Sequence, residues 1–224
     1  MANVNSYSGG MAAPDKTTLP EIVRVASELL ERTGAAGLTM QAVAAGVGVR
    51  APSLYKRVAG REALLQLVSD AQLRELGARL ETARNLPDLA NRFRAFAHER
   101  PEAFQLIMSP GRGVAAPDAG TVTVPDPGTA TAADASAAAD HAAPVAASAA
   151  VLRLVARTLP EVEVIDAART LTAWATGFVT MELGGGFQLE GDIERAWNYG
   201  VDRMTALIGG RGQADSARTP ASRP

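Results

Sequence analysis

The stretch from Leu38 to Val58 reads LTMQAVAAGVGVRAPSLYKRV, and it decides the fold of the N-terminal part of the chain. Thr39 is suited to cap a first short helix, because its hydroxyl can accept a backbone N–H in the first turn. Gly48 stands where the chain must turn, since glycine adopts a positive φ without steric penalty. A second helix is predicted from about Ala51, with Pro52 in its first turn, where the missing N–H costs nothing. Two short helices joined by a tight turn are typical of a helix-turn-helix, whose second helix enters the major groove of DNA.

The second predicted helix has an apolar side and a polar side. Leu54 and Val58 are spaced so that both face inward. The hydroxyls and cations around them suit contacts with DNA phosphates and base edges. From Arg50 to Arg61 the chain carries four cations and no acid. An ordinary helical hairpin with a solvated basic face has the same spacing, so the spacing alone leaves both interpretations open.

Residues 19–85 resemble the N-terminal domain of the TetR family of transcriptional regulators. The family pattern is an opening helix followed by T-x-x-x-(V/L)-A-x-x-x-G-V-S-x-x-(S/T)-L-Y-x-(H/R)-F-x-x-(K/R)-E-x-L. The matching positions here are Thr39, Val43-Ala44, Gly48-Val49, Ser53-Leu54-Tyr55, Arg57, Arg61-Glu62 and Leu64. Three positions depart from the commonest residues: Arg50 replaces Ser or Thr, Val58 replaces Phe, and Arg61 replaces Lys. Loss of the capping hydroxyl at Arg50 is expected to cost about 1 kcal/mol in that helix.

The resemblance implies a homodimeric, sequence-specific DNA-binding transcriptional regulator, with repression as the commoner outcome in the family. Its binding to a double-stranded operator would be modulated by a small apolar ligand. The two recognition helices of a homodimer would lie about one DNA turn apart, roughly 34–36 Å. The implied domains are a helix-turn-helix domain over 18–60 and a helical regulatory and dimerisation domain over 61–208, between tails at 1–17 and 209–224.

The resemblance also implies which side chains contact DNA. Thr39, Tyr55 and Arg61 would hold phosphates, as the matching family positions do. For Tyr55 the alternative is an ordinary aromatic residue of the core. The candidates for base edges or neighbouring phosphates are Gln41, Arg50, Ala51, Pro52, Ser53, Lys56 and Arg57.

The composition limits the other classes of function. The 224 residues carry a formal net charge of −2, so a basic DNA-binding surface must be local. There is no cysteine and there are two histidines, which argues against disulfides and metal clusters. With no nucleotide loop and no paired carboxylates in an apolar setting, we expect no metal, no cofactor and no catalysis. No apolar run reaches the roughly 18 residues of a membrane span, and residues 1–18 do not resemble a signal peptide, so we expect a cytoplasmic protein.

Apolar residues recur at helical spacing through most of the chain, and the Ala-rich, aromatic-poor composition also favours helices. We therefore predict an all-α fold. The apolar stripe of 61–85 drifts along its length, which indicates contacts with two modules. The predicted helices cover 20–33, 61–85, 88–100, 101–108, 149–158, 164–183 and 192–207, besides the two of the helix-turn-helix.

Residues 111–147 are mostly Ala, Pro, Thr, Gly and Asp, with almost no large apolar group. Such a segment cannot bury enough surface to offset its ordering entropy. We predict a low-complexity insertion between two helices of the C-terminal domain, and disordered tails at 1–17 and 209–224 on the same ground.

Two stretches of the C-terminal half resemble one TetR subgroup, named for a Trp-His-Gly motif. One is Phe93–Met108. The other is Trp174-Ala175-Thr176-Gly177-Phe178, where Thr176 replaces the subgroup's histidine. A ligand pocket is expected among the large apolar residues of these stretches, although a filled core would show the same pattern. The candidates for the pocket are Phe93, Phe104, Met108, Leu171, Trp174 and Phe178.

The helices 164–183 and 192–207 are expected to pair with their counterparts in a second chain as a four-helix interface. The candidates for that interface are Phe178, Val179, Trp197, Gly200, Val201 and Met204. Two alternatives to the ligand-responsive regulator stay open at this point. One is a constitutive DNA-binding dimer with a collapsed pocket, and the other, less favoured, is a small helical enzyme.

Overall fold

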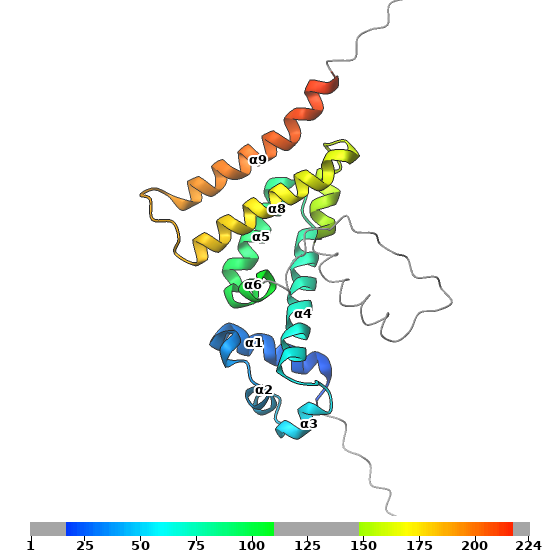
Figure 1. The fold of residues 1–224 in the computed structure, drawn as a ribbon, viewed down its shortest axis with the longest axis vertical. Helices are drawn as coiled ribbons and strands as arrows, with labels where there is room; N and C mark the ends of the chain where they lie inside the picture. Colours follow the sequence, from blue (N-terminus) through cyan, green and yellow to red (C-terminus); the bar gives the residue numbers. More distant parts are fainter. Residues whose placement is uncertain (1–16, 110–147, 217–224) are drawn as a thin grey trace, which may run out of the picture. The chain divides into compact units, whose positions relative to one another are not determined.

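The computed structural model describes residues 17–109 and 148–216, with side chains up to residue 209. Every regular element in these ranges is a helix, which confirms the predicted all-α class (Figure 1). A short helix spans 148–155. None of the helices described is long and apolar enough to cross a membrane. The others are α1 (Leu19–Gly37), α2 (Met40–Gly46), α3 (Ala51–Tyr55), α4 (Arg61–Glu81), α5 (Leu86–Glu99), α6 (Pro101–Met108), α8 (Glu161–Leu183) and α9 (Ile193–Ser216).

The chain divides into two compact units, residues 1–64 and 65–224. The division falls inside α4, whereas the sequence placed a domain boundary at residue 60. One helix therefore contributes residues to both units, as the drift of its apolar stripe indicated.

In the first unit α1 packs on α2, and α2 packs on α3. Thr18 caps α1 by accepting a hydrogen bond from the backbone N–H of Glu21. The face of α1 that the spacing predicted is buried, including Ile22 and Leu30. The element runs to Gly37, but Gly34, with a φ of 67° and a ψ of 175°, breaks its helical backbone with a kink directly after residue 33, where the sequence predicted the end of the helix.

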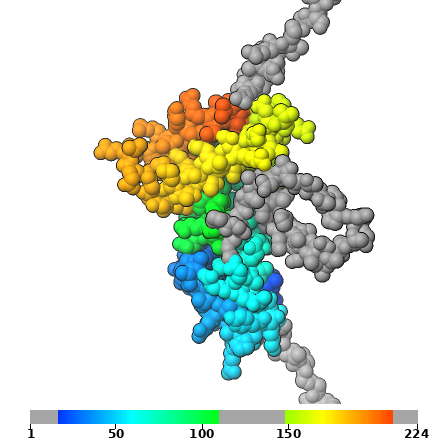
Figure 2. All heavy atoms as spheres, viewed as in Figure 1, coloured from blue at the N-terminus to red at the C-terminus, as the bar shows by residue number. Residues whose placement is uncertain are grey.

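In the second unit α5 packs against α6, α8 and α9, and α8 packs against α9. Figures 1 and 2 both show α9 lying along α8. The core contains Phe96, Phe104, Ile107 and Trp197, whose exposed fractions are 1% or less. Full burial of a large apolar side chain stabilises a fold by about 1.5–3 kcal/mol, so these residues hold the helices of this unit together.

Two tryptophans join α8 to α9. The rings of Trp174 and Trp197 stack with their centroids 5.0 Å apart. Gly200 permits this approach, because a Cβ atom there would lie only 2.2 Å from Cζ2 of Trp174. The indole N–H of Trp197 donates to Oδ1 of Asn91 at 2.7 Å, which ties α5 to the same cluster.

Several predicted helix ends differ from the observed ones, most clearly those of α4 and α9. The helix expected over 61–85 ends at Glu81, because the chain turns and Asn85 caps α5 by accepting the N–H of Asp88 at 2.8 Å. The last helix runs to Ser216, although the polar composition predicted a tail from residue 209. The predicted insertion at 111–147 lies outside the described residues, as do 1–16 and 217–224.

Candidate nucleic-acid interface

Local interactions form the turn between α2 and α3. Thr39 caps α2, with its Oγ1 accepting the backbone N–H of Ala42 at 3.1 Å. Gly48 adopts a φ of 73°, the left-handed conformation expected at the turn. Arg50 precedes α3 and makes no side-chain capping bond, in keeping with the absence of a Ser or Thr hydroxyl there.

The polar and apolar sides of α3 are separated as the spacing predicted. Leu54 and Val58 are 0% and 2% exposed and belong to the core. Tyr55 is 54% exposed, which excludes the alternative of a core aromatic residue. The other exposed residues of this stretch are Arg50, Pro52, Ser53, Lys56 and Arg57, with Ala51 half-buried.

The start of α2 adds two exposed polar side chains, Thr39 and Gln41. The Thr39 hydroxyl uses its oxygen as the acceptor of the cap, which leaves the hydroxyl proton free to be donated. Thr39 can therefore cap the helix and still donate to a phosphate oxygen.

Arg61 is used differently from the other candidates. Its Nε donates to the carbonyl oxygen of Leu38 at 2.9 Å, and its guanidinium also donates to the carbonyl oxygen of Ala35. The side chain thus holds the end of α1 against the start of α4, and this geometry does not support the phosphate contact expected for it. The sequence did not reveal this role, because the two carbonyls lie 23 and 26 residues before Arg61.

Together the exposed residues of 39–57 form a cationic, hydroxyl-bearing edge. No acid interrupts it between Arg50 and Arg61. Cations attract the phosphate backbone, and hydroxyl, amide and guanidinium groups can bind base edges. The edge is thus chemically suited to a DNA groove.

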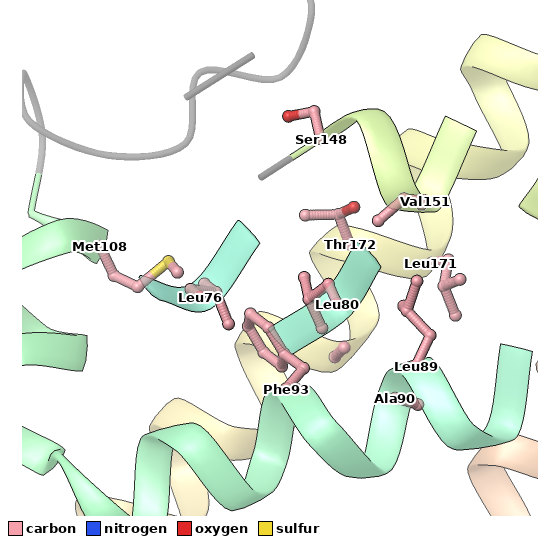
Figure 3. A pocket seen from close by; sticks show the side chains of 11 residues that line it. Leu76, Leu80, Leu89, Ala90, Phe93, Met108, Ser148, Val151, Leu171 and Thr172 are labelled. Atoms are coloured by element: carbon pink, nitrogen blue, oxygen red, sulfur yellow. The ribbon is translucent and has the colours of Figure 1, made fainter. Parts of the chain in front are cut away.

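The second unit contains a cavity of about 40 Å³ (Figure 3). Three of the residues predicted for a pocket line it: Phe93, Met108 and Leu171. The sequence missed the others, because apolar residues at helical spacing look alike whether or not a cavity lies between them. These are Leu76, Leu80, Leu89, Ala90, Ser148, Val151, Thr172 and Ala175.

The other three pocket candidates are used in packing. Phe104 is 1% exposed and meets Phe93 edge-on, with the ring centroids 5.5 Å apart. Trp174 and Phe178 lie in the aromatic cluster with Trp197, at centroid distances of 5.0 and 5.2 Å from its ring. These large rings fill the space between the helices and are not among the described residues that line this cavity.

The residues predicted for a dimer interface are largely occupied within one chain. Val179, Trp197 and Val201 are at most 5% exposed, and Gly200 is covered by Trp174. Phe178 and Met204 are half-buried against the same core. Helical spacing identified a buried face correctly, but within one chain α5, α8 and α9 already cover most of it, which leaves Phe178, Gly200 and Met204 partly exposed.

The geometry defines a helix-turn-helix protein with an exposed basic edge and a helical second unit. Residues 22–68 match the model of the bacterial regulatory proteins of the tetR family, and 86–204 match that of the tetracyclin repressor-like C-terminal domain. The chain belongs to the TetR family, and it is a DNA-binding transcriptional regulator. A comparison with curated proteins found no match.

Solved structures share the fold at low sequence identity. A protein of unknown function from Rhodococcus sp. RHA1 is 18% identical, with a TM-score of 0.65 over 88% of this chain and 100% of its own. BioQ with its natural double-stranded DNA operator is 17% identical, with a TM-score of 0.56 over 87% and 99%. A TetR variant from Acinetobacter baumannii AYE in complex with minocycline is 21% identical, with a TM-score of 0.56 over 86% and 97%.

Proposed function

We propose that this regulator binds a pseudo-palindromic operator as a homodimer, placing α3 in the major groove. The observation that carries the proposal is the separation of sides on α3: Leu54 is fully buried, while Tyr55 and the neighbouring cations are exposed. In this arrangement Thr39 and Tyr55 hold phosphates. Gln41, Arg50, Ser53, Lys56 and Arg57 reach base edges or adjacent phosphates, and Ala51 and Pro52 offer apolar contacts. The structure of BioQ with its DNA operator, which has this fold, supports the same use of the motif here.

The test is a mobility-shift titration on the DNA upstream of the protein's own gene, at several salt concentrations. Lys56→Ala is expected to weaken binding and to lower the slope of log K against log salt by about 0.9, one phosphate contact. Tyr55→Phe removes only the hydroxyl and is expected to weaken binding at all salt concentrations by a similar factor. Arg32→Ala, an exposed cation on α1, is the control. Unchanged binding in both interface variants would refute the contact assignment.

We propose a homodimer through exposed apolar side chains of α8 and α9, in place of the buried residues named above. Val162 is 84% exposed, and Leu207 is 55% exposed. Several large apolar groups left in water on two helices that pack together are candidates for burial against a second copy of the chain. Further exposed apolar residues on these helices are Ile165, Met181, Ile193 and Tyr199.

Light scattering after gel filtration tests this interface. The chain is expected to be a dimer, and Leu207→Asp is expected to shift it towards monomer because a carboxylate cannot be buried unpaired. Gln188→Asp, an exposed change in the segment between the two helices, is the control. A wild-type chain that stays monomeric at all concentrations contradicts the proposal and removes the half-site spacing argument.

We propose that a small apolar ligand occupies the cavity of the second unit and changes operator affinity. Linkage requires that such a ligand bind differently to the DNA-competent and the released conformations. The minocycline complex of the A. baumannii TetR variant supports ligand binding in this fold. The alternative is a constitutive regulator, for which a cavity of about 40 Å³ stays without a ligand. This alternative is favoured if ligands that bind in the cavity leave the affinity for the operator unchanged.

Three finer assignments complete the proposal. Membership of the Trp-His-Gly subgroup is supported by three matching positions of its motif, Trp174, Gly177 and Phe178. Thr176 stands in place of the subgroup's histidine. Repression is proposed because it is the commoner outcome in the family. Family membership supports a role without catalysis, in the cytoplasm where the bacterial chromosome lies. A transcription assay on the upstream promoter distinguishes repression from activation.

A further inference from the structure

No charged side chain lines the cavity of the second unit within 17–109 and 148–209. The described residues that line the cavity are the eleven drawn in Figure 3, and they include no Asp, Glu, His, Lys or Arg. Moving a carboxylate or an ammonium group from water to such a place without a partner is strongly unfavourable. The cavity therefore selects against charged ligands.

Two hydroxyls, from Ser148 and Thr172, form the polar part of the lining and lie on the same side of the cavity in Figure 3. Thr170, two residues earlier on α8, donates its hydroxyl proton to the carbonyl of Asp166 at 2.8 Å. Thr172 makes no comparable bond to any residue in the described ranges. Its hydroxyl can therefore bind an oxygen of a ligand.

The opposite side of the cavity is apolar, with Ala90 and Phe93 of α5 among its residues. The cavity of about 40 Å³ is larger than the roughly 10–15 Å³ that a single water molecule needs. This suits the end of an alkyl chain or a small ring. Met108 at the edge has a flexible thioether that can adjust to the remainder of a longer ligand.

We propose, on the basis of the ligand-responsive function proposed above, that the effector is a neutral molecule with an apolar end and one hydroxyl or carbonyl oxygen. Its apolar end enters beside Phe93, and its oxygen binds the hydroxyl of Thr172. Carboxylates and amines of the same length are rejected, because no side chain of opposite charge lines the cavity in the described part of the chain.

The experiment is a ligand-observed NMR titration of the full chain with 1-hexanol, hexanoate and hexylamine at pH 7. These probes share a chain length and differ in the terminal group. 1-Hexanol is expected to bind at least roughly tenfold more tightly than either charged probe. Equal or tighter binding of hexanoate or hexylamine, or no binding of 1-hexanol, overturns the proposal.

Two pairs of variants locate the binding. Thr172→Val is expected to weaken 1-hexanol binding roughly twofold to tenfold, the loss of one hydrogen bond, while Thr170→Val on the same helix leaves it unchanged. Ala175→Leu fills the cavity and is expected to abolish binding, while Ala173→Leu, an exposed change on α8, does not. Binding that survives Ala175→Leu, or that Thr172→Val leaves unaltered, places the ligand elsewhere and overturns the assignment.

The titration contains no DNA, so it is independent of the operator experiment. A failure here leaves the DNA contacts of Tyr55 and Lys56 standing, and a failure there leaves the chemistry of the cavity standing. If Ala175→Leu does not fold by circular dichroism, the comparison of the three probes and the Thr172→Val pair decide the result.

Discussion

Replacing Glu182 with leucine is expected to destabilise the second unit by about 3 kcal/mol, because it leaves a largely buried guanidinium without its main partner. Arg94 of α5 contacts both carboxylate oxygens of Glu182, with N–O distances of 2.9 and 2.6 Å. The two side chains are only 14% and 10% exposed. The same guanidinium also contacts Glu194 and lies over the ring of Trp197, 5.2 Å from its centroid.

The control is Glu194→Gln, because Glu194 contacts the same guanidinium but is 64% exposed. An exposed pair contributes roughly 0–1 kcal/mol, so this variant is expected to change stability little. The double variant Arg94→Met, Glu182→Leu is expected to recover part of the loss, since it removes both charges together.

Urea unfolding followed by tryptophan fluorescence measures these effects. Both tryptophans of the chain, Trp174 and Trp197, lie in the second unit, so the signal reports on that unit. Protein concentration is held fixed, because association shifts the midpoint. The reasoning is refuted if Glu182→Leu costs no more than Glu194→Gln, or if the double variant loses the full sum of its two single variants.

Three further predictions concern pH, packing and the first unit. The hydrogen bond from Arg94 lowers the pKa of Glu182 from its usual value of 4.5, against the effect of burial and with a smaller contribution from His98. The ionised carboxylate therefore stabilises the fold above pH 4.5, and this stability is lost as acid protonates it. In unfolding followed by fluorescence, Glu182→Gln is expected to make the free energy of unfolding fall less steeply as the pH is lowered. Gly200→Ala is expected to lower the free energy of unfolding by about 1–3 kcal/mol, because the new methyl group displaces Trp174. Gly209→Ala, also on α9 but with open space around it, is expected to raise that free energy by about 0.5–1 kcal/mol. Equal effects of the two variants in the same urea unfolding assay contradict the packing argument. Arg61→Ala is expected to lower the stability of the first unit, measured by circular dichroism, by about 1–3 kcal/mol, because the carbonyl of Leu38 loses its donor while that of Ala35 keeps the backbone N–H of Leu38. The salt slope of DNA binding is expected to stay unchanged; a lowered slope would instead support a phosphate contact of Arg61.

The helix-turn-helix was predictable because its determinants are local. The cap at Thr39 and the turn at Gly48 depend on residues within a few positions of each other. The inward direction of Leu54 and the exposure of Tyr55 follow from the period of a helix.

The second unit was predicted less completely because its contacts are distant in sequence. The spacing showed that Trp197 would be buried, but not that Trp174 and Asn91 of the same chain would bury it. Arg94 and Glu182 are 88 residues apart, and nothing in the pattern of either helix pairs them.

The amino-acid sequence by itself determined the all-α class, the position of the turn and the cationic edge of α3. Its helix-turn-helix motif also indicated membership of the TetR family. These depend on backbone preferences and on a period of 3.6 residues, which act over a few positions. Only the tertiary structure decided that Arg61 binds the carbonyls at the end of α1, that the aromatic residues of α8 and α9 fill a core, and that no charged side chain of the described ranges lines the cavity. Such features depend on which helix faces pack together. Burial of apolar surface is non-directional, so the apolar pattern of one helix does not specify the helix that it packs against.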